Sequence, residues 1–146
     1  MASGAKDRLI KLWDPSQGKN IANLLHHTNA INHIKFSLCG NYLFSTGKDQ
    51  LIRVVDLRQM KEIIQLPGHF TEIVKLAVHP TNNQLLASAD IEGKVCLWNP
   101  IYGYPVDMQI HEGGFNLPGV SFINQGEKIV TLSHDKSLKV WQIVSK

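Results

Sequence analysis

Short apolar segments separated by polar turns run along the whole chain. Segments such as INHIKF, IVKLAV, QLLAS and KIVTL are short, rich in β-branched side chains, and either alternate or run apolar. Stretches such as SLCGN, PTNN and NQGE lie between them and favour turns. Only DLRQMKEI could form a helix longer than one turn, and its polarity fits a loop that leads into the next strand. The pattern predicts an all-β fold.

One nine-residue motif occurs four times, as KDRLIKLWD, KDQLIRVVD, the weaker IEGKVCLWN, and HDKSLKVWQ. The equivalent positions are separated by 42, 43 and 43 residues and are held by Trp13, Val55, Trp98 and Trp141. A period of about 40–45 residues with four short strands in each is typical of the blades of a β-propeller. We therefore predict repeats that end near Asp14, Asp56, Asn99 and Gln142.

Composition narrows the class of protein further. A chain of 146 residues with 43% hydrophobic residues is expected to form one domain with a packed core. No apolar run approaches the roughly 20 residues of a membrane span, and MASGAKDR has no apolar stretch that could serve as a secretory signal. We therefore expect an intracellular protein with no membrane contact. The net charge of +3 permits contact with a polyanion without requiring it.

A set of polar residues recurs with the same period. It comprises His27, Ser45 and Asp49, then His69, Ser88, Glu92 and Trp98, then His111, Thr131, Asp135 and Trp141. An indole N–H donates a hydrogen bond, a hydroxyl both donates and accepts, and an imidazole can bridge a hydroxyl to a carboxylate. These groups can therefore satisfy one another when they are buried. Only the last repeat holds all four residue types, because Val55 replaces tryptophan in the first full repeat and Glu92 replaces aspartate in the second.

These residues resemble those of the WD-repeat family. LIKLWD, the Gly68–His69 pair and the recurring polar set carry the resemblance, which covers almost the whole chain. It implies four-stranded blades of a β-propeller with the polar set hydrogen-bonded inside each blade, completely in the last repeat and in part in the other two. Residues 1–146 are then expected to form a single WD-repeat domain, a partial propeller of about three to four blades. Such a chain would be a fragment of a larger propeller, or would associate with itself or another chain through its open edges.

A catalytic role is the main alternative for the polar set, since serine, histidine and aspartate form the triad of many hydrolases. A triad is needed once, whereas this set recurs with the period of the fold. GNYLFSTGKD lacks the spacing of a phosphate-binding loop, and no acid or cysteine completes a metal site around His26, His27 and His33. Cys39 and Cys96 show no metal-binding or disulfide spacing. We expect no enzyme activity, no cofactor and no metal.

Basic residues recur at the turn between the second and third strands of the repeats. The fold would place Lys6, Arg8, Lys48 and Lys136 on one rim, which is a candidate site for RNA or for a protein partner. A solvated surface is the alternative. Exposed aromatic side chains that could stack on bases are not spaced among these lysines.

Within the WD-repeat family, the order and spacing of four runs resemble the WD-repeat subunit of the pre-mRNA cleavage and polyadenylation factor. The runs are KDRLIKLWDPSQGK, DLRQMKEIIQLPGHFTEIVKLAVHP, EGKVCLW and HEG. This resemblance implies a nuclear, non-catalytic scaffold for mRNA 3′-end processing, with a zinc-finger protein and the large scaffold subunit as partners. Asp56 and Arg58 also resemble the Asp-x-Arg box by which some WD-repeat substrate receptors dock onto a cullin-type ubiquitin ligase adaptor. The alternative for Arg58 is a surface residue paired with a neighbouring acid.

Overall fold

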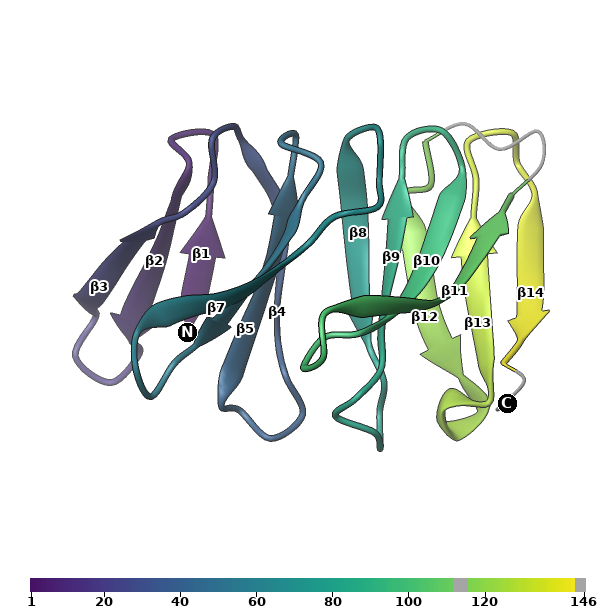
Figure 1. Cartoon of the computed structure of the whole chain (residues 1–146). Coiled ribbons are helices and arrows are strands. Elements are labelled where there is room, and N and C mark those ends of the chain that lie inside the picture. The colour runs from purple at the N-terminus through teal and green to yellow at the C-terminus, as the bar shows by residue number, and fades with distance from the viewer. Residues whose placement is uncertain (112–115, 144–146) are drawn as a thin grey trace.

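The computed structural model describes residues 1–111 and 116–143, which fold into four antiparallel sheets (Figure 1). The first sheet contains β1 (Ala2–Gly4), β2 (Leu9–Asp14) and β3 (Lys19–Leu25). The second contains β4 (Ile31–Phe36), β5 (Tyr42–Gly47), β6 (Ile52–Asp56) and β7 (Lys61–Leu66). The third contains β8 (Ile73–Val78), β9 (Leu86–Asp90), β10 (Lys94–Asn99) and β11 (Tyr104–Ile110). The fourth contains β12 (Gly119–Ile123), a 3₁₀ turn η1 (Asn124–Gly126), β13 (Lys128–Leu132) and β14 (Leu138–Gln142).

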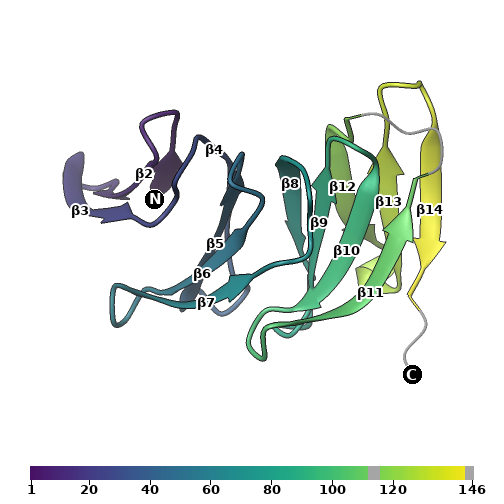
Figure 2. The same cartoon turned by 45° about the horizontal axis from the view of Figure 1, so that its top comes forward.

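The four sheets stand side by side in chain order, as the blades of a partial propeller (Figures 1 and 2). We number them blades 1 to 4. The innermost strands β4, β8 and β12 of blades 2 to 4 contact one another in sequence, and β3, β7 and β11 lie on the outer side of their sheets. In blade 1, β1 pairs with β2 as β5 pairs with β6, so β1 corresponds to the second strand of the other blades. The strands β2, β6, β10 and β14 end at Asp14, Asp56, Asn99 and Gln142, the positions at which the sequence repeats end.

The third and outermost strands of blades 1 to 3 share one irregularity. The register shifts between Leu12 and Trp13 in blade 1, between Val54 and Val55 in blade 2, and between Leu97 and Trp98 in blade 3. A bulge of this kind bends the strand and increases its twist. Because it recurs at the same place, the outermost strands of the three blades bend alike.

The hydrophobic core consists of layers between adjacent blades. Ile10, Leu12 and Leu24 of blade 1 pack against Leu43 and Val55 of blade 2. On its other face, blade 2 packs against the third blade in a layer formed by Phe44, Ile52, Val54, Leu66, Ile73, Leu76, Leu86, Cys96 and Trp98. A further layer joins blades 3 and 4. Each sheet therefore depends on its neighbour to bury an apolar face.

The turn between the second and third strands has the same backbone conformation in every blade. The equivalent residues Arg8, Gln50, Gly93 and Lys136 have φ values of 68°, 65°, 90° and 68°. This left-handed region is unfavourable for a residue with a Cβ atom, and only blade 3 places glycine there.

We expect replacement of Gln50 by Gly to raise the free energy of unfolding by about 0.5–1 kcal/mol. A left-handed conformation costs a residue with a Cβ about 1–2 kcal/mol, and the greater freedom of glycine in the unfolded chain offsets part of that gain. The matched substitution Gly93→Ala should lower the free energy of unfolding by about 1 kcal/mol. Urea denaturation measures both, and the same sign for the two substitutions would contradict this account of the turn.

Candidate functional site

A chain of hydrogen bonds crosses the interior of blade 3. The indole Nε1 of Trp98 donates to the hydroxyl of Ser88 at 2.7 Å, and this hydroxyl lies 2.6 Å from Nε2 of His69. Nδ1 of His69 lies 2.7 Å from a carboxylate oxygen of Asp90. Because the indole can only donate, the hydroxyl donates to Nε2, and the imidazole carries its proton on Nδ1 and donates it to Asp90. All four side chains are buried. The indole N–H, the serine hydroxyl and the imidazole N–H each have an acceptor within this network.

Asp90 occupies the place that the sequence prediction gave to Glu92, so that prediction is wrong. The other Ser–Asp pairs are four residues apart, whereas Asp90 follows Ser88 by two residues and ends β9. Its second oxygen accepts the backbone N–H groups of Glu92 at 3.0 Å and Lys94 at 2.9 Å. The carboxylate of Asp90 therefore stabilises the turn and orients the His69 ring at the same time. The side chain of Glu92 is exposed. The set in blade 3 is complete, where we expected a partial one.

Burial and hydrogen bonding act on Asp90 in opposite directions. Burial alone would raise the pKa of the carboxyl group, but the hydrogen bonds from His69 and from the Lys94 and Glu92 amides outweigh it. The pKa therefore lies below its ordinary value, and the group stays ionised beside the imidazole.

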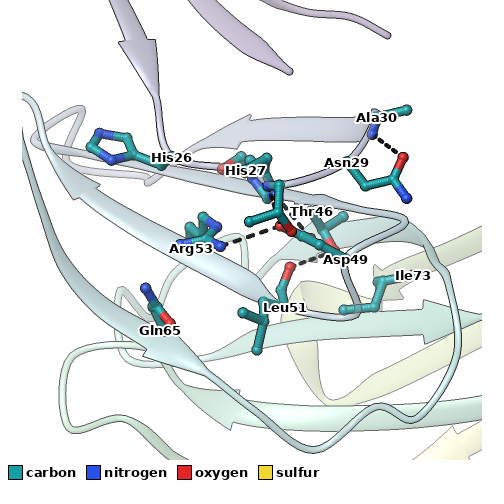
Figure 3. A network of polar contacts seen from close by, with 12 residues as sticks. His26, His27, Asn29, Ala30, Thr46, Asp49, Leu51, Arg53, Gln65 and Ile73 are labelled. Carbon is teal, nitrogen blue, oxygen red and sulfur yellow. Dashed lines mark hydrogen bonds and ion pairs between the residues drawn. The ribbon is translucent and has the colours of Figure 1, made fainter. Parts of the chain in front are cut away.

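Blade 2 has the same core of contacts without the indole, and Figure 3 shows its His27, Asp49 and Arg53 side chains. His27 lies 2.7 Å from the hydroxyl of Ser45 through Nε2 and 2.8 Å from Asp49 through Nδ1. Val55 takes the place of tryptophan, as expected. Arg53, cross-strand from Ser45, is buried and forms ion pairs with Asp49 at 3.3 Å and Glu62 at 2.9 Å. The sequence offers no clear signal for this extension, because Arg53 lies at a position occupied by lysine in two other repeats.

Blade 4 contains the predicted residues in a different order of contacts. Trp141 donates to Thr131 at 3.0 Å, and Thr131 lies 3.0 Å from Nδ1 of His111. Nε2 of His111 lies 2.7 Å from the hydroxyl of Ser137, which in turn lies 2.5 Å from Asp135. Ser137 therefore stands between the imidazole and the carboxylate. The direct His111–Asp135 contact implied by the resemblance is not formed, and the imidazole proton lies on Nε2.

Blade 1 contains the donor end of the network, together with an ion pair between Lys11 and Asp7 at 3.5 Å that corresponds to the Arg53–Asp49 pair of blade 2. Trp13 donates through Nε1 to the hydroxyl of Ser3 at 2.8 Å, and Ser3 is exposed. Ser3 faces Lys11 across the strand pair, as Ser45 faces Arg53 in the next blade.

The distances in blades 2 and 3 match those of a hydrolase triad, but the surroundings do not match. The side chains of Ser45 and Ser88 are fully buried inside their sheets, so a substrate carbonyl could not reach either hydroxyl. The Ser88 oxygen also accepts the indole N–H of Trp98, which opposes attack by that oxygen. A nucleophile must be accessible to react. The geometry therefore supports a structural role for both sets.

The predicted basic rim lies along one edge of the blades, at the top of Figure 1. Lys6, Arg8, Lys48 and Lys136 are all exposed in the turns between second and third strands. Acidic side chains accompany them: Asp7, Glu92 and Asp135 lie in the same turns, and Lys48 pairs with Glu72 at 3.5 Å. The rim thus carries charges of both signs.

An exposed aromatic residue on this edge was missed by the sequence reasoning. Phe70 follows the network residue His69, its side chain is 80% exposed, and the ammonium of Lys94 lies 4.9 Å from the centre of its ring. Lys94 also donates to the carbonyl of Gly68 at 2.6 Å. The available signal was an aromatic residue directly after the Gly–His pair.

Asp56 and Arg58 form a close pair at the end of β6. The guanidinium donates to the two carboxylate oxygens at 2.6 Å and 3.0 Å and lies 5.7 Å from the centre of the Tyr42 ring. Hydrogen bonding and the charge of Arg58 lower the pKa of Asp56 to about 2, against a smaller opposing effect of burial. The Arg58 side chain is 58% exposed. It is therefore paired with a neighbouring acid and is also accessible to a partner.

The three histidines considered as metal ligands are not brought together. His26 lies 3.7 Å from Glu62, His27 belongs to its network, and Nδ1 of His33 accepts the backbone N–H of Leu76 in the next blade at 3.1 Å. Within residues 1–111 and 116–143, no group of three His, Cys, Asp or Glu side chains could hold a metal ion. Burial raises the pKa of the Cys96 thiol to about 12, which makes this cysteine unreactive near neutral pH.

A family model of the WD domain, G-beta repeat, matches residues 18–56 and 60–99, which make up more than half of the chain. The chain belongs to the WD-repeat family. Each matched WD repeat begins with the outermost strand of one blade and ends with the third strand of the next, so each repeat ties two blades together. WD repeats generally form non-catalytic scaffolds that bind other proteins.

Several curated WD-repeat proteins are similar to this chain. Nuclear distribution protein PAC1-1 of Uncinocarpus reesii (strain UAMH 1704) is 40% identical over 86 residues, which cover 56% of this chain and 19% of the relative. A chromatin assembly factor 1 protein of Gallus gallus is 25% identical over 174 residues, covering 100% of this chain and 30% of the relative. Periodic tryptophan protein 2 homolog of Caenorhabditis elegans is 26% identical over 146 residues, which cover 99% of this chain and 16% of the relative. The chain thus spans less than a third of the length of these relatives.

Across the part of the chain that the structure describes, no helix has the length and apolar character needed to cross a membrane.

Asp90→Ala should lower the free energy of unfolding by about 3 kcal/mol, because it leaves a buried imidazole N–H and two backbone N–H groups without their acceptor. Glu92→Ala should change it by less than about 0.5 kcal/mol, as is usual for an exposed residue. Urea denaturation of the two variants compares them directly. A larger effect of Glu92→Ala would restore the prediction made from the sequence.

The contact between His33 and Leu76 should make stability depend on pH. Burial, with the nearby charges of Lys75 and Lys35, lowers the pKa of His33 to about 4, whereas the unfolded chain titrates near 6.5. Below pH 6.5 the unfolded state binds a proton that the folded state does not, so this contribution to stability is lost as the pH falls from about 6.5 to 4. His33→Gln retains an acceptor without the titration. Its stability should vary less with pH over that interval, and equal slopes for variant and native protein would refute this assignment.

Proposed function

We propose that the protein is a non-catalytic WD-repeat scaffold whose rim between second and third strands binds protein partners. The observation that carries this proposal is the division of polar residues in blades 2 to 4. Histidine, serine or threonine, and aspartate take part in hydrogen-bonded networks, which are buried in blades 2 and 3, while Phe70 and charges of both signs remain exposed on one edge. Exposed aromatic residues surrounded by charges are typical of the contacts that dominate protein interfaces.

The finer proposal is that this scaffold serves the nuclear complex that cleaves and polyadenylates pre-mRNA. Its support is the order and spacing of the runs KDRLIKLWDPSQGK, DLRQMKEIIQLPGHFTEIVKLAVHP, EGKVCLW and HEG. On this basis the partners are the large scaffold subunit and the zinc-finger subunit, and the protein acts in the nucleus. The relatives described above carry other names, so this assignment depends on those runs alone.

RNA is the less favoured occupant of the rim. Phosphate binding requires a surplus of basic residues, and here Asp7, Glu92 and Asp135 lie among the lysines, with Lys48 paired to Glu72. A mixed surface of this kind suits a protein partner with complementary charges.

A cullin-type ubiquitin ligase adaptor is the alternative partner, through Asp56 and Arg58. The accessible guanidinium favours it. The contacts with Asp56 and Tyr42 oppose it, because a docking interaction would have to break or share them.

Affinity capture from nuclear extract tests these proposals. Tagged protein should retain polyadenylation-factor subunits, and Phe70→Ser should reduce their recovery about tenfold or more, as expected for the loss of a dominant aromatic contact. The control Leu38→Ser removes an apolar side chain of 53% exposure from the loop between β4 and β5 and should leave recovery unchanged.

Other outcomes of the capture experiment separate the alternatives. Recovery of a cullin adaptor that is lost with Arg58→Ala would favour the ubiquitin ligase reading. Equal recovery with Phe70→Ser and the native protein would overturn the assignment of the rim. If the eluate matches that of an untagged control, the scaffold proposal fails as a whole.

A further inference from the structure

Blade 3 carries a lysine that is flanked by exposed apolar side chains. Lys94 begins β10, and its ammonium lies 4.9 Å from the centre of the Phe70 ring. Its cross-strand partner on β11 is Ile110, so these two side chains share one face of the sheet, with about 4.5–5.5 Å between their Cβ atoms. Phe70 is 80% exposed and Ile110 is 65% exposed, and Met108, on the same face of β11, is 52% exposed. We call these four side chains the Lys94 surface.

The fold does not require a lysine at this position. Leucine occupies the equivalent position of blades 1 and 2, at Leu9 and Leu51. The outer strand shows the reverse exchange, because Asn23 of β3 and Gln65 of β7 are the equivalents of Met108. Blade 3 is thus apolar where blades 1 and 2 are polar, and it places a cation beside that apolar surface. It is an internal blade with four strands, flanked by blades 2 and 4.

The ammonium of Lys94 is held in place and still has donor capacity. It donates to the carbonyl of Gly68 at 2.6 Å and faces the Phe70 ring. An ammonium has three N–H donors, and no ion pair formed among the described residues includes Lys94. A negatively charged group from a partner can therefore bind a cation that is already positioned.

The loop that carries Phe70 is fixed by the network of blade 3. His69 is buried and hydrogen-bonded to Asp90. Gly68 packs against the indole of Trp98, where an added Cβ atom would approach the ring to 2.8 Å. The Phe70 ring and the Gly68 carbonyl therefore start from anchored backbone positions. Preorganisation of this kind increases affinity, because less conformational freedom is lost on binding.

The surroundings of the ammonium favour a carboxylate over a phosphate group. Among the side chains of the Lys94 surface only Lys94 is basic, and Glu92 is exposed in the turn directly before it. A phosphate group carries nearly two negative charges and is repelled more strongly by such an acid. In an extended peptide, alternate side chains point to the same side about 6.5–7 Å apart. That arrangement suits a central acid on Lys94 with apolar side chains on either side of it.

We propose that the Lys94 surface binds an extended segment of a partner protein in which an aspartate or glutamate has apolar residues two positions before and two positions after it. The carboxylate accepts a hydrogen bond from Lys94, and the apolar side chains pack on Phe70 and on Ile110 with Met108. This inference rests on the proposed function, because Phe70 belongs to the proposed partner-binding rim, and it adds the chemistry of the partner.

Selection of random linear peptides on the immobilised native chain tests the proposal. The retained peptides should share an acid with apolar residues two positions away on each side. Lys94→Leu introduces the residue found in blades 1 and 2, so the variant should remain folded by circular dichroism and lose the selection for an acid. Lys94→Glu should select a basic residue instead. Lys19→Glu, an exposed substitution on β3, is the matched control and should select the same peptides as the native chain.

A double-mutant cycle on the most strongly retained peptide isolates the contact. In fluorescence anisotropy, replacing the acid of the labelled peptide by its amide should weaken binding to the native chain about tenfold, as expected for one charge-assisted hydrogen bond. The same replacement should leave binding to Lys94→Leu unchanged.

The proposal is overturned if no peptide is retained, if the retained peptides lack an acid, or if the amide peptide binds equally weakly to both chains relative to its parent. It is also overturned if light scattering shows a native dimer that Lys94→Leu dissociates, because a second copy would then occupy the surface. Capture from nuclear extract judges the scaffold function separately. Loss of the acid preference together with reduced capture by Phe70→Ser would overturn this inference alone.

Discussion

A buried hydrogen-bond donor needs an acceptor, and this requirement organises the polar networks of blades 2 to 4. In blade 3 it is met by a chain that runs from the Trp98 indole through Ser88 and His69 to Asp90, with each group donating to the next. Leaving one donor unpaired would cost about 1–3 kcal/mol. The network also joins the loop before the first strand to the second and third strands. In blades 2 to 4 it therefore fixes where the blade begins relative to its central hairpin.

The networks also explain how residue types associated with catalysis occur without a catalytic site. A hydroxyl, an imidazole and a carboxylate at hydrogen-bonding distances are placed where the following strands and the preceding blade exclude substrate. The edge of the blades, where we propose that protein partners bind, carries Phe70, Lys94 and the charged turns. Because each WD repeat contributes strands to two blades, a partner bound at one turn contacts a rigid array rather than an isolated loop.

The sequence was sufficient for the periodic features and insufficient for the local ones. The spacing of Trp13, Val55, Trp98 and Trp141 predicted the all-β propeller, because a period of about 40–45 residues accommodates four short strands in each blade. The acid in blade 3 could not be found by spacing. Asp90 accepts turn amides as well as the imidazole, which lets it act from a position two residues earlier than its counterparts. Ser137 was missed because it lies in the turn before β14, at a position that leucine or lysine holds in the other blades. The Arg53 extension was missed because its second partner, Glu62, comes from the neighbouring strand β7, outside the repeated motif.

Hydrogen exchange of the three indole N–H groups, followed by NMR, tests the central claim most directly. Each indole N–H donates a hydrogen bond to a hydroxyl, and the packing around that hydrogen bond determines how strongly the N–H is protected from exchange with solvent. Trp98 is fully buried between two complete blades, Trp141 is half-buried, and Trp13 is half-buried and bonded to an exposed serine. The account predicts slowest exchange for Trp98, intermediate or fast exchange for Trp141, and fast exchange for Trp13, with Ser88→Ala accelerating Trp98 alone. Equal exchange rates for the three indoles, or no effect of Ser88→Ala, would contradict it.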